Sequence, residues 1–198
     1  MFPLGTVLFP SQVAALHVFE QRYRTMVDDC LSQGREFGVV LIERGSEVGG
    51  GDVRTGVGTI ARISEARELP DGRWLLAVVG TRRLRVVEWL DDDPYPRAEI
   101  EEWPDGDDGD PAQLDAARAL LRRALALKAE LGEPAVPIAT EVSDEAGLGS
   151  FQVAALAPIG PADQQELLRA EGAGARLALL VELLEDEVTT LEGRLSLG

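Results

Sequence analysis

The stretch AALHVFEQRYRTMVDDCLSQ, residues 14–33, joins the two local patterns that decide the fold of the first half of the chain. Ala14–Phe19 is an apolar run that predicts a β-strand. Glu20–Gln33 predicts a helix, because apolar residues recur at helical spacing and Gly34 follows as a stop signal. The apolar stripe of this helix comprises Tyr23, Met26, Val27, Cys30 and Leu31. One helix therefore interrupts a half of the chain that otherwise has the pattern of β-strands.

Short apolar or β-branched segments, bounded by Gly, Pro and Asp, fill the rest of this half and are typical of an antiparallel, barrel-like β domain. The further strands that we expect are Thr6–Phe9, Phe37–Glu43, Val57–Ser64, Trp74–Val79, Leu84–Leu90 and Arg97–Glu102. The turn LPDGR, residues 69–73, predicts a hairpin, because Pro fixes φ and Gly accepts a positive φ. Residues 1–103 are thus predicted to form a β-rich domain.

The second half of the chain has a different pattern. Residues 104–110, PDGDDGD, cannot contribute to a core, so we expect a solvated acidic hinge there. Residues 111–198 are predicted to form a small helical bundle. Its expected helices are Pro111–Leu131, a short helix capped by Ser150 that runs to Ala157, Pro161–Ala170, and Ala173–Leu195 with a continuous leucine stripe. The predicted fold class is α+β.

Composition restricts the partners and the compartment. The chain has 198 residues, and 19 basic against 35 acidic residues give a net charge of −16, which repels a phosphate backbone and argues against nucleic-acid binding. Cys30 is the single cysteine, so no disulfide framework can form. No apolar run has the length of a membrane span, and the first residues lack the features of a signal peptide. We expect a cytoplasmic protein without a membrane partner.

The common catalytic motifs are missing. A phosphate-binding loop needs a Gly-Lys pair, and the single lysine, Lys128, follows Leu127. Gly56–Ala61 has the spelling of a dinucleotide turn, but a β-branched stretch follows it where a helix is required. Lys128 has no nearby serine for a Ser-Lys dyad, and Ser150 does not lie in a G-x-S-x-G elbow. The sequence predicts no catalytic residue and no cofactor.

Metal and anion sites have little support. Cys30 and His17 supply too few ligands for zinc, and Cys30 lies on an apolar stripe, so we predict a core role for it. The aspartates at positions 105, 107, 108 and 110 do not match a calcium loop, because Gly109 occupies a ligand position and no bidentate Glu follows. Arg82, Arg83 and Arg85 form a basic cluster on a predicted strand, with the last two on one face. We interpret this cluster as a solvent-facing surface; contact with a carboxylate or phosphate is the alternative.

Several motifs occur in an order that is informative. They are FPL at 2–4, VLFP at 7–10, LHVFEQRYRTMV at 16–27, FGVV at 37–40, VGTIA at 57–61, LPDGR at 69–73, GTRRLRV at 80–86, PY at 94–95, AEI at 98–100, ADQQELL at 162–168 and RL at 176–177. This series resembles the N-terminal domain of Lon protease, the Lon substrate-binding family, over nearly the whole chain. Ser11 and Leu84 depart from the family pattern, which usually has Gly and an aromatic residue there. The ATPase and protease segments of Lon are absent from this sequence.

The resemblance implies a PUA-like β pseudo-barrel with a helical appendage, and a free-standing, non-enzymatic module that binds unfolded or exposed apolar polypeptide. Such binding requires an apolar groove and a sheet edge. As candidate contacts we select the aromatic residues Phe9, Phe19, Trp74, Trp89, Tyr95 and Trp103. The motif residues that we expect to stabilise the fold are Pro10, Glu20, Arg22, Tyr23, Gly58, Asp71, Gly72 and Gly80. The expected partners are unfolded polypeptides, together with a separate protease or chaperone that receives them.

Three other classes of function stay open at this point. The leucine stripe of Ala173–Leu195 can serve a protein–protein adaptor or a homodimer. The PUA-like resemblance and the arginine cluster suggest nucleic-acid binding, which the net charge of −16 opposes. A hydrolase is the last alternative, because Ser, Asp and Glu are plentiful.

Overall fold

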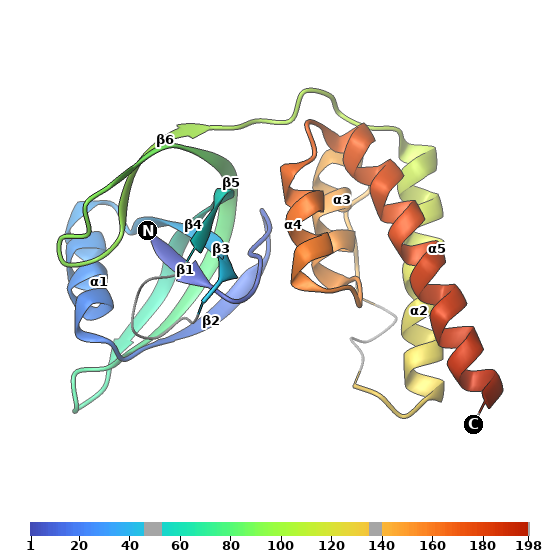
Figure 1. Cartoon of the computed structure of the whole chain (residues 1–198), viewed down its shortest axis with the longest axis horizontal. Helices are drawn as coiled ribbons and strands as arrows, with labels where there is room; N and C mark the ends of the chain where they lie inside the picture. The colour runs from blue at the N-terminus through green and yellow to red at the C-terminus, as the bar shows by residue number, and fades with distance from the viewer. Residues whose placement is uncertain (46–52, 135–139, 198) are drawn as a thin grey trace. The chain divides into compact units, whose positions relative to one another are not determined.

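The computed structural model describes residues 1–45, 53–134 and 140–197. The chain divides into two compact units, Met1–Pro104 and Asp105–Gly198 (Figure 1). Among the described residues, the first unit contains the β-strands and one helix, and the second contains four helices. The predicted α+β fold class is confirmed.

The first unit is built on one sheet that curls into an open barrel (Figure 1). Its strands are β1 (Phe2–Leu4), β2 (Val13–Val18), β3 (Glu36–Arg44), β4 (Val53–Glu68), β5 (Trp74–Leu90) and β6 (Arg97–Glu102). The order is β1-β3-β4-β5-β2, and β6 pairs with the second part of β5. The pair β1–β3 is parallel and the other pairs are antiparallel. Strands β1 and β2, close together in sequence, therefore lie at the two ends of this order.

Four strand predictions differ from the structure. Val57–Ser64 is only the middle of β4, which extends beyond it at both ends. Thr6–Phe9 is not a strand: it is an irregular segment whose residues Val7–Phe9 are buried, with the Leu8 carbonyl accepting a 2.6 Å hydrogen bond from the Thr59 hydroxyl. Trp74–Val79 and Leu84–Leu90 are parts of the single strand β5, which continues through the polar residues between them. Strand β1 was not predicted, because three residues are too few to show a period.

The hairpin at residues 69–73 is confirmed. The amide of Leu69 donates to the carbonyl of Arg73, and the amide of Gly72 donates to the carbonyl of Leu69, both at 2.8 Å. Gly72 has a φ of +79°, as the turn requires. This turn joins β4 to β5 and fixes the register of the longest pair in the sheet.

Helix α1 (Gln21–Gln33) packs on the sheet through the predicted stripe. Tyr23, Met26 and Val27 are buried, and Cys30 and Leu31 are partly buried against the same cluster. The rings of Phe2 and Tyr23 meet edge to face at 4.6 Å between centroids, which connects α1 to β1. The helix ends at Gly34, whose φ is +120°.

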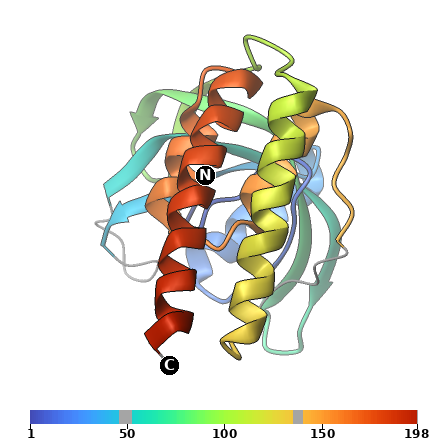
Figure 2. The same ribbon diagram turned by 90° about the vertical axis from the view of Figure 1, so that its right-hand side faces the viewer.

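The second unit contains α2 (Pro111–Glu130), α3 (Ala146–Leu156), α4 (Pro161–Arg169) and α5 (Ala173–Leu197). Helices α2 and α5 lie side by side (Figure 2). Leu177, Leu180, Leu184 and Leu191 of the predicted stripe are buried. Since this unit itself covers most of the stripe, the apolar surface left for a partner helix is small.

Two local predictions in this unit need correction. Helix α3 begins at Ala146 and not at Ser150; the Ser150 hydroxyl lies inside the helix, donating to the Gly147 carbonyl and accepting from Arg176. Asp105 and Asp107, predicted to lie in a solvated hinge, make specific bonds within the second unit. Asp105 pairs with Arg176, and Asp107 accepts hydrogen bonds from the amides of Gly109 and Gly174 at 2.9 and 2.7 Å. The domain limits at residues 103 and 110 stay predictions.

Over residues 1–45, 53–134 and 140–197, His, Cys, Asp and Glu do not cluster in a way that could hold a metal ion. In the same ranges, every helix is too short or too polar to span a membrane.

Candidate functional site

A groove lies between the two strands at the ends of the sheet order. It is lined by Phe2–Leu4 of β1, by Ala15–Glu20 from β2 and the residues after it, and by Tyr23 of α1. We call it the β1–β2 groove. Successive side chains of a strand point to opposite faces, so a groove that touches consecutive residues runs along the edge of that strand. The groove therefore runs between the edge of β1 and the edge of β2, two strands that do not pair with each other.

The size of the β1–β2 groove selects the class of ligand. Its volume is about 220 Å³. Drug-sized ligands and cofactors occupy pockets of roughly 300–1,000 Å³. A volume below this range fits individual side chains of a peptide better than a whole cofactor.

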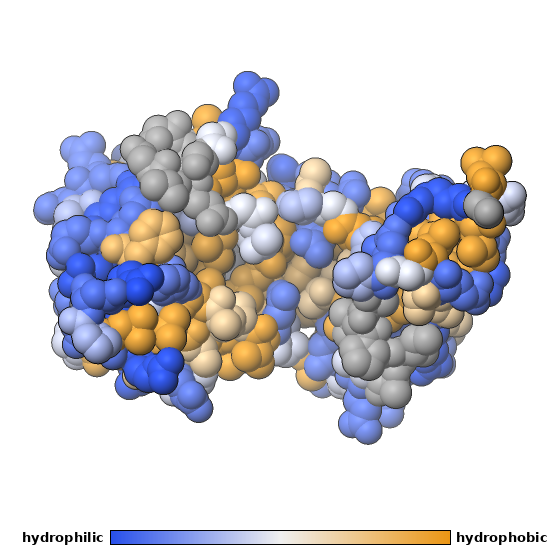
Figure 3. Space-filling model, turned by 90° about the horizontal axis from the view of Figure 1, so that it is seen from below, coloured by the Kyte–Doolittle hydropathy of each residue, from blue (hydrophilic) through white to orange (hydrophobic). Residues whose placement is uncertain are grey.

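The surface of the groove is mainly apolar. Phe19 is 50% exposed at its rim, and its ring lies 6.0 Å from that of His17. Glu20 accepts a 3.1 Å hydrogen bond from Arg22 and is thereby held beside the start of α1. Figure 3 shows apolar residues gathered in patches among hydrophilic ones on the N-terminal unit. The groove can bind apolar side chains, and its described lining contains no serine, cysteine or lysine nucleophile.

Among the predicted contact residues, Phe19 alone lies in this groove as an exposed aromatic. Phe9 is a correction: it is 0% exposed and belongs to the core, so it cannot touch a ligand in this conformation. Trp74 and Tyr95 are half-buried against the main core cluster, and Trp89 packs on a second cluster. The guanidinium of Arg54 lies over the Trp89 ring at 5.0 Å. The structure does not bring these rings together into one binding surface.

Trp103 stacks with two members of the arginine cluster. The guanidinium groups of Arg83 and Arg85 lie 4.5 and 4.3 Å from its ring centroid, so these residues share one face, as predicted. Arg83 is only 3% exposed, which corrects the prediction that the whole cluster faces solvent. Arg85 pairs with Glu101 at 3.4 Å. The cluster stabilises the junction of β5 and β6 and does not form an open anion site.

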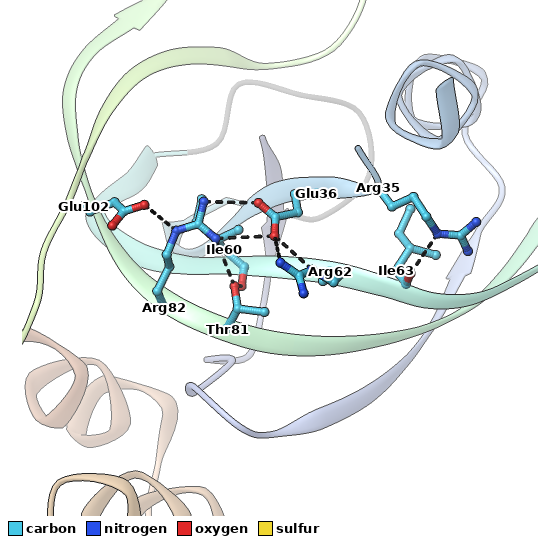
Figure 4. A network of polar contacts seen from close by, with 8 residues as sticks. All are labelled: Arg35, Glu36, Ile60, Arg62, Ile63, Thr81, Arg82 and Glu102. Carbon is cyan, nitrogen blue, oxygen red and sulfur yellow. Dashed lines mark hydrogen bonds and ion pairs between the residues drawn. The ribbon is translucent and has the colours of Figure 1, made fainter. Parts of the chain in front are cut away.

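A polar network across β3, β4, β5 and β6 was missed by the sequence analysis (Figure 4). Glu36 accepts from Arg62 at 2.7 Å and from Arg82 at 3.1 Å, and Arg82 donates to Glu102 at 2.7 Å. Hydrogen bonds from Arg82, and then from Arg62, hold the pKa of Glu36 below its usual value. No local signal identifies these partners, because they depend on strand register. With Arg82 also paired, acidic side chains oppose much of the positive charge that suggested nucleic-acid binding.

The motif residues occupy positions that fit a structural role, which stays a prediction. Pro10 is buried, and Arg22 lies over the ring of Tyr23 at 4.5 Å. Gly58 and Gly80 lie where the carbonyls of Val39 and Phe9 approach so closely that a Cβ would overlap them. Asp71 accepts from the amide of Arg73 in the turn, and this bond lowers the pKa of its carboxyl group.

Tyr95 has a structural partner and a testable titration. Its hydroxyl donates to Asp29 at 2.7 Å. Burial, together with this hydrogen bond to Asp29, raises the pKa of Tyr95 to about 12. The folded state thus favours the neutral phenol. The contribution of this hydrogen bond to the free energy of unfolding is therefore complete below pH ~10 and is lost as the pH rises toward 12. We expect Tyr95→Phe to lower the free energy of unfolding, measured in urea, by about 1 kcal/mol at neutral pH.

In Tyr23→Phe, Tyr95 is the single remaining tyrosine, so its phenolate absorbance titration can be followed alone and should lie near pH 12. A titration of Tyr95 near pH 10 in Tyr23→Phe would show that the Tyr95–Asp29 bond does not form in solution.

Known proteins resemble this chain over most of its length. The family "ATP-dependent protease La (LON) substrate-binding domain" matches residues 1–186. Lon protease of Anaeromyxobacter dehalogenans is 28% identical over 91% of this chain, and Lon protease 2 of Herpetosiphon aurantiacus is 27% identical over 96%. The chain spans only 22% and 24% of the lengths of these two relatives.

Solved structures agree with the family match. The Lon N-terminal domain protein of Xanthomonas campestris has a TM-score of 0.67 and 30% identity, covering 91% of this chain and 95% of that one. The N-terminal domain of the Mycobacterium avium complex Lon protease shares the fold, with a TM-score of 0.65 at 18% identity over 93% of this chain and 97% of that one. The chain therefore belongs to the Lon substrate-binding domain family.

Proposed function

We propose that this protein recognises polypeptides, and that it binds an unfolded or exposed apolar segment in the β1–β2 groove. The observation that carries the proposal is the groove itself: an apolar channel of about 220 Å³ between two strand edges, with a half-exposed phenylalanine at its rim. An extended segment fits such a channel, because its side chains alternate along the chain and each can enter a small pocket.

The role is one of binding without catalysis. Lys128, the single lysine, forms an ion pair with Glu133 at 2.8 Å, which leaves it poorly suited to activate a serine. The family to which the chain belongs is named for substrate binding. We propose that the bound polypeptides pass to a separate protease or chaperone in the cytoplasm.

The first test compares a labelled, permanently unfolded polypeptide with its folded counterpart by fluorescence anisotropy. We expect saturable binding of the unfolded form alone. Phe19→Ala should weaken this binding about tenfold, as removal of an aromatic anchor does in other interfaces. The control is Val87→Ala on β5, because Val87 is 62% exposed but lies outside the lining of the groove.

If Phe19→Ala and Val87→Ala bind the unfolded polypeptide with equal affinity, the binding site lies outside the groove. Absence of binding to any unfolded polypeptide would overturn the proposed function and favour an adaptor that needs a specific folded partner.

A further inference from the structure

Three strands lie at edges of the described sheet, and they differ in how they are protected. Natural edge strands avoid unwanted pairing by being short or by carrying charged side chains. β1 has only three residues, and β6, with the sequence RAEIEE, has four charged residues out of six. β2, with the sequence VAALHV, has six residues and neither Lys, Arg, Asp nor Glu. β2 is therefore the unprotected edge of this sheet.

The free side of β2 borders the β1–β2 groove. β2 pairs with β5 from Val13↔Val79 to Val18↔Trp74, and this is its only pairing among the described strands. In an antiparallel ladder, alternate residues direct both their N–H and C=O groups away from the partner strand. Since the groove touches the consecutive residues Ala15–Phe19, these outward groups face the space in which we place the ligand.

The side chains of β2 are arranged for such pairing. Along the strand, Val13, Ala15 and His17 are exposed, whereas Leu16 and Val18 face the core. This regular alternation is that of an extended strand, and the small side chain of Ala15 leaves the backbone accessible to a neighbouring strand.

Charge identifies the occupant. Residues 1–104 carry 12 Arg against 17 Asp and Glu, a net charge of −5, and Glu20 is the acidic side chain in the described lining of the groove. A second copy of this unit would bring charge of the same sign to the edge, which opposes self-association. A segment of another polypeptide that is apolar and carries basic residues is attracted by the same charge. Acidic segments should be rejected.

We propose that the β1–β2 groove binds its polypeptide by β-strand addition, with an extended apolar and basic segment hydrogen-bonding to the free edge of β2. This inference rests on the proposed function and adds the mode of binding and the substrate class. Backbone hydrogen bonds do not depend on side-chain identity, so strand addition explains how one groove can accept many sequences.

The test uses short labelled peptides of alternating Val and Arg residues, with the full chain as the receptor. Two further peptides carry N-methyl groups on the backbone at alternate residues, one at odd and one at even positions. We expect at least one methylated set to lose about tenfold or more in affinity, because several edge hydrogen bonds are lost together. A peptide of alternating Val and Glu should bind more weakly than the Val and Arg peptide at low salt.

The outcomes separate this inference from the proposed function. If both methylated peptides bind as well as the parent while Phe19→Ala still weakens binding, the groove recognises side chains alone and strand addition is wrong. If the parent peptide and unfolded polypeptides both fail to bind, the proposed function itself is wrong. If light scattering shows a dimer that Ala15→Lys dissociates and Val87→Lys does not, the edge of β2 pairs with a second copy, which overturns the inference.

Discussion

Arg176→Met should lower the free energy of unfolding of the helical unit by about 3–5 kcal/mol, the usual cost of breaking a buried ion pair. Arg176 lies on α5 and is 0% exposed. Its Nη1 donates to Asp105 at 3.1 Å, its Nη2 also bonds to Asp105, and its Nε donates to Ser150 at 2.8 Å. The guanidinium carbon lies 3.5 Å from the centroid of the Phe151 ring. Removal of this one side chain takes the ion pair from the Asp105 carboxylate, and from the buried Ser150 hydroxyl the hydrogen bond that it accepts.

The measurement is urea unfolding of the full chain, followed by circular dichroism of the helices. Trp74, Trp89 and Trp103 all lie in the first unit, so tryptophan fluorescence reports that unit separately. Arg123→Met is the matched control. Arg123 forms an exposed pair with Glu192 at 2.9 Å, and such a pair contributes about 0–1 kcal/mol.

The double variant Arg176→Met/Asp105→Asn distinguishes a lost pairing from lost packing. We expect it to recover part of the stability, because the carboxylate charge that Arg176 neutralised is removed as well. A loss no larger for Arg176→Met than for Arg123→Met would contradict the buried network.

Local patterns in the sequence predicted the elements whose cause is local. The stripe of α1 follows from helical periodicity, and the turn at residues 69–73 follows from Pro and Gly at fixed offsets. Arg97–Glu102 matches β6 at both ends. Here the interactions that fix the conformation lie within a few residues of one another.

Elements that depend on distant partners were missed. β1 exists because Phe2–Leu4 aligns with Val39–Leu41, far along the chain. Arg176 pairs with Asp105, which lies 71 positions earlier in the sequence, and no local sequence pattern predicts a pair at that separation. The β1–β2 groove depends on which strands end the sheet order, so it is a property of topology. Phe9 and Phe19 are the same residue type, and only the fold shows that the first lies in the core and the second is exposed.

Phe9→Ala should lower the free energy of unfolding of the first unit by about 3–5 kcal/mol, the usual cost of removing a buried aromatic ring. Phe19→Ala should change that free energy by less than about 1 kcal/mol, because Phe19 is already 50% exposed in the folded state. Tryptophan fluorescence during urea unfolding measures both variants. Phe9→Leu is the conservative control and should retain most of the stability, since it keeps an apolar side chain in the core.

Polypeptide binding should show the opposite order for the same two residues. In buffer without urea, where both variants are folded, Phe19→Ala should bind the unfolded polypeptide more weakly. Phe9→Leu should bind it as the unmodified chain does. The structural reason is that Phe9 is 0% exposed and Phe19 lines the groove. Loss of affinity in Phe9→Leu with intact stability would mean that the segment before β2 opens to expose its core residues, and the binding surface would then have to include it.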